Sequence, residues 1–263
     1  MDYLQIRVQG DLGKPTLIYL PGLHGDWTLV SSFRAAVRDH VRFVEFTYPR
    51  TLSWSLDDHA SALLDALNKH GIREGWILSE SFGSVLGWAL LDKGLAAQGV
   101  ILAGGFVRYP FMPLVGLAHC INRTIPRWAL AAFCRFYAAY AKLRHRKAPE
   151  TYEAIGEFLR RRTEPADREA ICYRYGLIQQ SDARKLARSL TIPVYQLCGF
   201  FDPIVPWWAV RKSLLRSCRT YRGWKLIWRA DHNVLGTAPR AAAEQIVTWL
   251  NASVPLSART PSP

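Results

Sequence analysis

Short apolar segments alternate with longer amphipathic ones through the first hundred residues of the chain. Four of the short segments predict buried strands, at residues 16–20, 42–47, 76–78 and 99–103. The intervening segments repeat apolar positions at helical spacing and predict helices, at 27–39, 57–70 and 82–93. Residues 4–8 alternate apolar and polar positions, which favours an antiparallel edge strand. Strands that alternate with helices predict βαβ units and a mostly parallel sheet.

The pattern changes after this region. Residues 106–190 show helical patterns and turns but no convincing strand. Strand patterns resume further on, and a last helix follows, at 193–198, 224–228 and 238–250. The simplest interpretation is one α/β core with an all-helical insertion, so that the core comprises 1–105 and 191–252 and the insertion 106–190. The tail, 253–263, is rich in Pro and Ser and is expected to be disordered.

Composition places the chain among globular proteins, since 49% of its 263 residues are hydrophobic and 21% are charged. The amino terminus lacks a basic region followed by an apolar run, and no stretch has the length of a membrane-spanning helix. We therefore expect a cytoplasmic protein. The five cysteines form no Cys-x-x-Cys pair and the seven histidines are scattered, so neither a metal nor a cofactor is expected.

The first segment with catalytic potential lies between a predicted strand and a predicted helix. Residues 79–83 read Ser-Glu-Ser-Phe-Gly. A serine at a sharp strand-to-helix turn needs small residues two positions before and after it, and Ser79 and Gly83 meet that need for Ser81. The turn would expose the Ser81 hydroxyl above the sheet, with the N–H of Phe82 directed at a reacting oxygen. The alternative is a serine that only caps the helix.

The second segment directly follows the strand at 16–20. Residues 20–27 read Leu-Pro-Gly-Leu-His-Gly-Asp-Trp. Gly22 and Gly25 would allow positive φ and a close approach to a substrate, and the N–H of Leu23 would be a second donor to an oxyanion. His24 stands between the two glycines and is expected, with them, to support the loop that carries this donor. A glycine-rich turn without a ligand is the alternative.

Two further candidates follow the last two predicted strands. Asp202 stands in Gly-Phe-Phe-Asp-Pro-Ile-Val-Pro, where it could reach an imidazole or merely form an Asx turn before Pro203. His232 stands in Ala-Asp-His-Asn, where it could be a general base or a surface histidine. Asp231 is a rival acid, but a residue adjacent to His232 in sequence cannot easily face its ring.

Together these motifs resemble the α/β-hydrolase superfamily, in which the triad follows the chain order Ser–Asp–His. The resemblance covers residues 1–105 and 190–252. It implies a serine hydrolase that cleaves a carboxylic ester or thioester through an acyl-enzyme on Ser81, with His232 as general base and Asp202 orienting it. Leu23 and Phe82 would form the oxyanion hole, and no metal is implied. The same fold also hosts lyases, acyltransferases and non-catalytic ligand-binding proteins, which the motifs do not separate.

The helical insertion resembles the cap that many α/β-hydrolases place over the active site. It carries 16 of the 34 Lys and Arg residues but only 7 of the 21 Asp and Glu residues. Residues 123–147 contain seven basic residues and no acidic one, and read as a basic amphipathic helix. One stripe of this helix is apolar, comprising Ala129, Phe133, Phe136, Tyr140 and Leu143, and the other face carries Arg127, Arg135 and Lys142.

Three interpretations of this basic helix stay open. It packs its aromatic residues on the core, it makes transient contact with an anionic membrane surface, or it recognises an acidic substrate. Nucleic-acid binding is not expected, because no recognition module accompanies the charge. The expected partner is a small, apolar acyl substrate, and the sequence makes no prediction of the oligomeric state.

Overall fold

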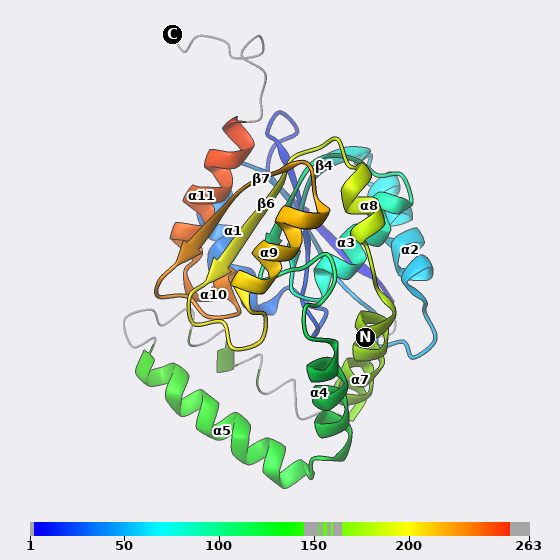
Figure 1. The fold of residues 1–263 in the computed structure, drawn as a ribbon. Coiled ribbons are helices and arrows are strands. Elements are labelled where there is room, and N and C mark those ends of the chain that lie inside the picture. Colours follow the sequence, from blue (N-terminus) through cyan, green and yellow to red (C-terminus); the bar gives the residue numbers. More distant parts are fainter. Residues whose placement is uncertain (1–2, 145–151, 153–154, 157–158, 160–164, 253–263) are drawn as a thin grey trace.

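The computed structural model describes residues 3–144, 152, 155–156, 159 and 165–252. Seven strands of this part form one sheet in the order β1-β3-β2-β4-β5-β6-β7 (Figure 1). Their bounds are Gln5–Gln9 (β1), Thr16–Leu20 (β2), Arg42–Thr47 (β3), Glu74–Glu80 (β4), Ala96–Ala103 (β5), Val194–Gly199 (β6) and Tyr221–Ile227 (β7). β1 pairs antiparallel with β3, as the alternating pattern at 4–8 predicted, and all other pairs are parallel.

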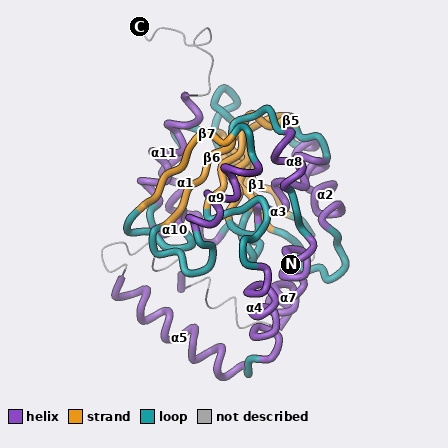
Figure 2. Tube along the Cα trace, in the orientation of Figure 1, coloured by secondary structure: helices purple, strands orange, loops and turns teal. Residues whose placement is uncertain are grey.

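Helices cover both faces of the sheet, which lies as a central layer between them (Figure 2). Strand β2 shows why the sheet is buried on both sides. Leu17 and Tyr19 pack with one apolar cluster, and Ile18 and Leu20 pack with the other. A strand that faces two cores has no polar face, which explains its continuous apolar sequence.

Each apolar cluster has its own set of helices. One face packs against α1 (Ser31–Val37), α10 (Val234–Thr237) and α11 (Pro239–Ala252). The other packs against α2 (Leu56–Lys69), α3 (Gly83–Asp92), α8 (Arg184–Ser189) and α9 (Trp207–Ser217). A short 3₁₀ helix, η1 (Thr28–Val30), precedes α1.

The predicted helices at 27–39, 57–70, 82–93 and 238–250 all have counterparts, but α9 and α10 were not predicted. In α9 the apolar pattern is not one-sided. Val210 and Leu214 are buried with Ser217, whereas Trp208 and Leu215 are exposed. Because large apolar residues occupy the outer face, periodicity alone does not reveal this helix.

The chain between β5 and β6 contains α4 (Met112–Thr124), α5 (Arg127–Arg144), α7 (Pro165–Gln180) and α8. α4 packs against α7, whereas α8 packs against α9 and buries Ala187 in the core. The division into a core and a cap at 106–190 stays a prediction, and the tail at 253–263 lies outside the described residues. No helix in the described part is long and apolar enough to cross a bilayer.

Candidate active site

Ser81 occupies a strained turn between β4 and α3. Its φ of 48° is the single positive value among the described residues other than glycine. For a residue with a side chain this region costs on the order of 1 kcal/mol or more, so the surrounding structure must hold it. The Ser81 N–H donates to the carbonyl of Ala103 at the end of β5, which ties the turn to the neighbouring strand.

The space around this turn explains the small neighbours. A Cβ atom at Gly83 would lie 2.1 Å from the carbonyl oxygen of Leu20, so no larger residue fits there. Ser79 is fully buried, and a Cβ atom at Gly87 would lie 2.4 Å from its hydroxyl oxygen. The predicted need for small residues on both sides of Ser81 therefore has a steric cause in the contact of α3 with β2 and β4.

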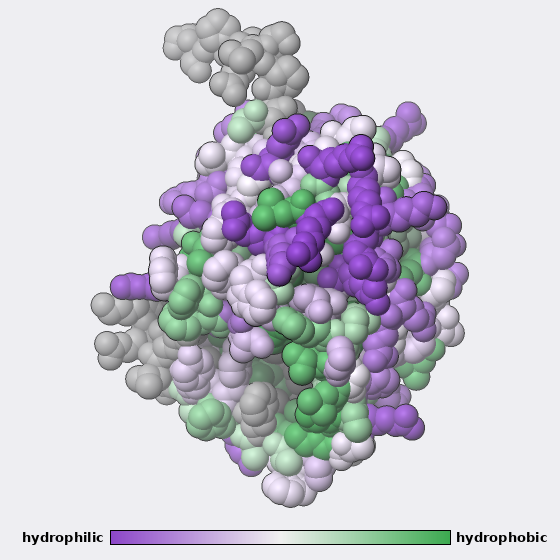
Figure 3. Space-filling view, in the orientation of Figure 1, coloured by the Kyte–Doolittle hydropathy of each residue, from purple (hydrophilic) through white to green (hydrophobic). Residues whose placement is uncertain are grey.

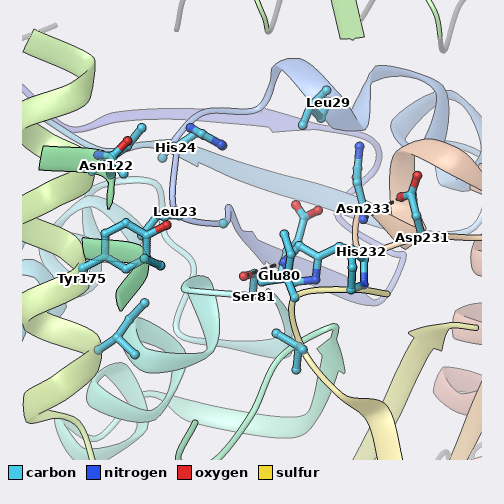
Figure 4. A pocket seen from close by; sticks show the side chains of 18 of the residues that line it. Leu23, His24, Leu29, Glu80, Ser81, Asn122, Tyr175, Asp231, His232 and Asn233 are labelled. Carbon is cyan, nitrogen blue, oxygen red and sulfur yellow. Dashed lines mark hydrogen bonds between the residues drawn. The ribbon is translucent and has the colours of Figure 1, made fainter. Parts of the chain in front are cut away.

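The fold brings the three predicted side chains together at the carboxyl edge of the sheet, and Figure 4 shows two of them, Ser81 and His232, side by side. The Ser81 Oγ lies 2.9 Å from His232 Nε2, and His232 Nδ1 lies 2.8 Å from Asp202 Oδ2. A carboxylate can only accept, so the Nδ1–H donates to Asp202 and the Nε2 lone pair faces the Ser81 hydroxyl.

Two backbone amides fix the Asp202 carboxylate. Its Oδ1 accepts from the N–H of Ile204 at 2.9 Å and of Val205 at 2.8 Å, which leaves Oδ2 for the imidazole. The Asx turn and the contact with His232 are thus two functions of one side chain. The rival Asp231 turns elsewhere, and its Oδ1 accepts from the Asn233 N–H at 3.0 Å.

Burial of the His232 ring lowers its pKa, but nearby negative charge outweighs this effect. The charge and hydrogen bond of Asp202, together with Glu80 and Asp231, hold the pKa of His232 above its ordinary value. A histidine in this state is a better proton acceptor than a free imidazole, which suits a general base.

The predicted oxyanion donors lie beside Ser81. Figure 4 shows Leu23 next to Ser81, and Phe82 follows it in sequence. Neither amide N–H donates to another backbone group in the described part of the chain. Leu23 and His24 of this loop line the cavity together with Ser81.

The prediction of positive φ is confirmed for one of the two glycines of this loop. Gly25 has φ of 75°, whereas Gly22 does not adopt positive φ, so the prediction is wrong for Gly22. Gly25 lines the cavity and also makes room for Arg174, because a Cβ atom there would lie 2.6 Å from the guanidinium. Gly22 lies against Ser81, where a Cβ atom would be 3.5 Å from the serine Cβ.

Arg174 is a residue that the sequence analysis missed. It comes from α7 and is only 3% exposed. Its guanidinium donates to the carbonyl of Leu23 at 2.8 Å and to that of Pro49 at 3.0 Å, and it lies over the ring of Tyr48. A long-range contact of this kind has no local sequence signal, because 151 positions separate Arg174 from Leu23.

Glu80 is the second residue without a predicted function. Its side chain is buried, and its carboxyl accepts a hydrogen bond from the Tyr19 hydroxyl. Burial raises the pKa of Glu80, while the bond from Tyr19 and the charge of His232 lower it in part. Glu80 lines the cavity beside Ser81 (Figure 4), so its charge acts directly on the reacting groups.

A cavity of about 810 Å³ leads to Ser81. Core loops form one wall, and the helices between β5 and β6 form the other, with Leu114, Val115, Ala118, Leu130, Tyr137 and Ile171 among its lining residues. Most of this wall is apolar. The described residues hold no group of three or more side chains suited to bind a metal ion.

Comparison with protein-family models and with curated protein sequences gave no match. Solved structures, in contrast, match almost the whole chain. A thermophilic esterase from Thermogutta terrifontis is 20% identical, with 95% of this chain and 93% of that chain covered and a TM-score of 0.72. An enol-lactonase from Burkholderia xenovorans is 18% identical, with 94% and 96% covered and a TM-score of 0.75.

An esterase from Rhodococcus is 17% identical, with 95% of this chain and 94% of that chain covered and a TM-score of 0.70. At these identities the likeness establishes the fold. The chain has the α/β-hydrolase fold, with a mostly parallel sheet flanked by helices, which confirms the predicted fold class.

Proposed function

We propose that this protein is a serine hydrolase that cleaves a carboxylic ester or thioester through an acyl-enzyme on Ser81. The observation that carries the proposal is the continuous hydrogen-bonded series from Asp202 through His232 to Ser81. The strained backbone of Ser81 supports it, because strain at a single position indicates a functional constraint.

In the first half of the reaction, Ser81 Oγ attacks the carbonyl carbon of the substrate while His232 Nε2 takes the hydroxyl proton. The carbonyl oxygen becomes an oxyanion, which the N–H groups of Leu23 and Phe82 stabilise. Asp202 stabilises the imidazolium. When the intermediate collapses, His232 returns the proton to the leaving alcohol or thiol, and the acyl group stays on Ser81.

In the second half, His232 removes a proton from a water molecule as that water attacks the acyl carbon. The second oxyanion uses the same two N–H groups. Collapse releases the carboxylic acid and restores the Ser81 hydroxyl with the proton that His232 held. No cofactor enters this sequence of steps.

The cavity indicates the substrate class. Its apolar lining favours an acyl group or an alcohol without charge, and its volume is that of a site for a small molecule. Structurally similar proteins named as esterases and as an enol-lactonase support ester chemistry, since a lactone is a cyclic ester.

A fluorophosphonate probe tests the nucleophile. The probe phosphonylates an activated serine with loss of fluoride, so intact mass should show a single adduct on the wild-type protein. Ser81→Ala should lose the adduct, and its kcat for an ester should fall on the order of 10⁴-fold or more. Ser53→Ala changes an exposed serine and should behave as wild type.

An adduct that persists in Ser81→Ala would refute the proposal, as would a folded wild-type protein that never reacts. Product analysis in ¹⁸O-labelled water then separates hydrolysis from the alternatives. Label in the released acid supports hydrolysis, and unlabelled products indicate acyl transfer or elimination.

A further inference from the structure

The outward face of α4 is apolar although it faces solvent. Leu114, Leu117 and Ile121 follow each other at helical spacing and are 51%, 55% and 50% exposed. Figure 3 shows these apolar residues as a green area over α4 in the lower part of the molecule. An amphipathic helix of a globular protein normally turns such a stripe to the core, so an exposed one indicates a contact surface.

Helix α5, which follows α4 in the chain, also carries exposed apolar residues. Trp128 and Phe136 are 75% and 73% exposed, whereas Leu130, Tyr137 and Tyr140 line the cavity. The predicted apolar stripe therefore does not pack on the core as a unit, and for Phe136 that interpretation is wrong. We call Leu114, Leu117, Ile121, Trp128 and Phe136, with the exposed Arg123 and Arg135, the α4–α5 face.

The stretch of chain that forms this face carries charges of one sign, although Glu169 of α7 lines a surface pocket together with Arg123. Residues 93–149 contain nine Lys and Arg residues and no Asp or Glu. This acid-free stretch includes both α4 and α5. Basic residues near apolar side chains are the combination that binds an anionic lipid surface, through burial of the apolar groups and attraction to the headgroups.

The mouth of the cavity adjoins this face. Leu114, Phe201 and Ile204 line the cavity and are also about half exposed, so they mark its opening. Phe111 and Trp208, whose rings are 5.9 Å apart, continue the exposed apolar area beside it. A surface that covers the α4–α5 face would thus lie close to the entrance of the cavity.

We propose that the α4–α5 face docks on an anionic lipid surface. A second copy fits less well, because docking through the same face would set the acid-free residues 93–149 of two copies against each other. A lipid surface offers both an apolar interior and negative headgroups. The docking does not depend on the reaction at Ser81, so binding can be measured without activity.

Co-sedimentation of the full chain with vesicles tests this docking. We expect strong binding to vesicles that contain about one third phosphatidylglycerol in phosphatidylcholine, weak binding to phosphatidylcholine alone, and loss of binding as salt rises. Two variants probe the face. Leu117→Ser with Ile121→Ser, and separately Arg135→Glu, should each weaken binding about tenfold or more.

The cavity that leads to Ser81 is not lined by Leu117, Ile121 or Arg135. The reactivity of Ser81 toward the fluorophosphonate should therefore not change in these variants. Leu12→Ser and Arg73→Glu are matched controls, since both side chains are exposed outside α4 and α5. Both controls should bind vesicles as wild type.

Three results would overturn the proposal. Equal binding to neutral and anionic vesicles would show that negative headgroups do not attract the protein. Unchanged binding of the α4–α5 variants would show that this face does not contact the lipid. The third is a wild-type dimer in sedimentation equilibrium that Leu117→Ser with Ile121→Ser converts to a monomer, since a second copy then covers the face.

Discussion

Two buried carboxyl groups act on His232 from different sides. Asp202 holds the ring by a hydrogen bond to Nδ1, and its own position is set by two backbone amides. Among the described residues, Glu80 forms no hydrogen bond with the ring, yet its charge adds to that of Asp202. Asp202 thus both orients the imidazole and raises its pKa, whereas Glu80 contributes to the pKa alone.

We predict that Glu80→Gln moves the acidic limb of the pH profile to lower pH. Burial lowers the pKa of His232, whereas Asp202 and Glu80 raise it, so removal of one negative charge lowers that pKa. Only the neutral imidazole accepts the Ser81 proton, and activity therefore rises with pH through the pKa of His232. The kcat/KM of an ester across pH measures this limb.

At alkaline pH, kcat of Glu80→Gln should stay within about threefold of wild type, because Asp202 still orients the ring. Asp65→Asn removes an exposed carboxylate on α2 and should leave the profile unchanged. A limb that stays in place or moves to higher pH in Glu80→Gln would contradict the assignment.

At the scale of elements, α7 connects the helical insertion to loops of the core. Arg174 donates to Leu23 and Pro49, the Tyr173 hydroxyl donates to the carbonyl of Trp54, and Arg50 pairs with Asp167 at 2.9 Å. The bond to Leu23 reaches the loop with an expected oxyanion donor, whereas the others reach the chain after β3. One helix therefore stabilises two loops.

We predict that Arg174→Met lowers kcat about tenfold to a hundredfold, with little change in KM, because the Leu23 loop loses its fixed position. Arg174→Lys should recover only part of kcat. The guanidinium donates to the carbonyls of Leu23 and Pro49 through two separate nitrogens, whereas an ammonium has only one nitrogen. Steady-state kinetics on a short ester, with circular dichroism to establish folding, provide the measurement.

Tyr173→Phe is the matched control, because it removes a hydrogen bond from the same helix to a different loop. It should retain the wild-type kcat. Equal losses in Arg174→Met and Tyr173→Phe would assign the effect to general loosening of α7 rather than to the Leu23 loop.

At the scale of the whole molecule, the cavity exists because two parts of the chain meet. Gly22, Ser81 and His232 come from core loops, while Val115 and Ala118 come from α4. Ser81 and His232 therefore lie on loops at the edge of the sheet, and the opposite wall belongs to the helical segment. Under the proposed function, residues of that wall could change the substrate without any change to Ser81.

We predict that Ala118→Phe shortens the preferred acyl chain. The larger side chain would fill part of the cavity, so kcat/KM for an octanoyl ester should fall about tenfold or more, while that for an acetyl ester changes little. Leu117→Phe is the neighbouring control on the outer face of α4. An equal loss for both esters in Ala118→Phe would contradict the position of the acyl pocket.

Features that depend on local interactions could be predicted from the amino-acid sequence. Burial on two faces gives β2 a continuous apolar run, and the bounds of β2 and β3 match the predicted ones. The sharp turn at Ser81 requires small neighbours, and that requirement is local too. Since parallel strands end at one edge of the sheet, the loops with Asp202 and His232 could be expected beside Ser81.

Long-range contacts, burial and exposure depended on how the elements pack together. The contacts of Arg174 with Leu23 and Pro49 join positions far apart in sequence, so no periodicity reveals them. The burial of Glu80 depends on packing around the sheet, and the exposure of Phe136 depends on how α5 sits against the cavity. A pattern fixes which residues share a face of an element, but the surrounding elements decide which face is covered.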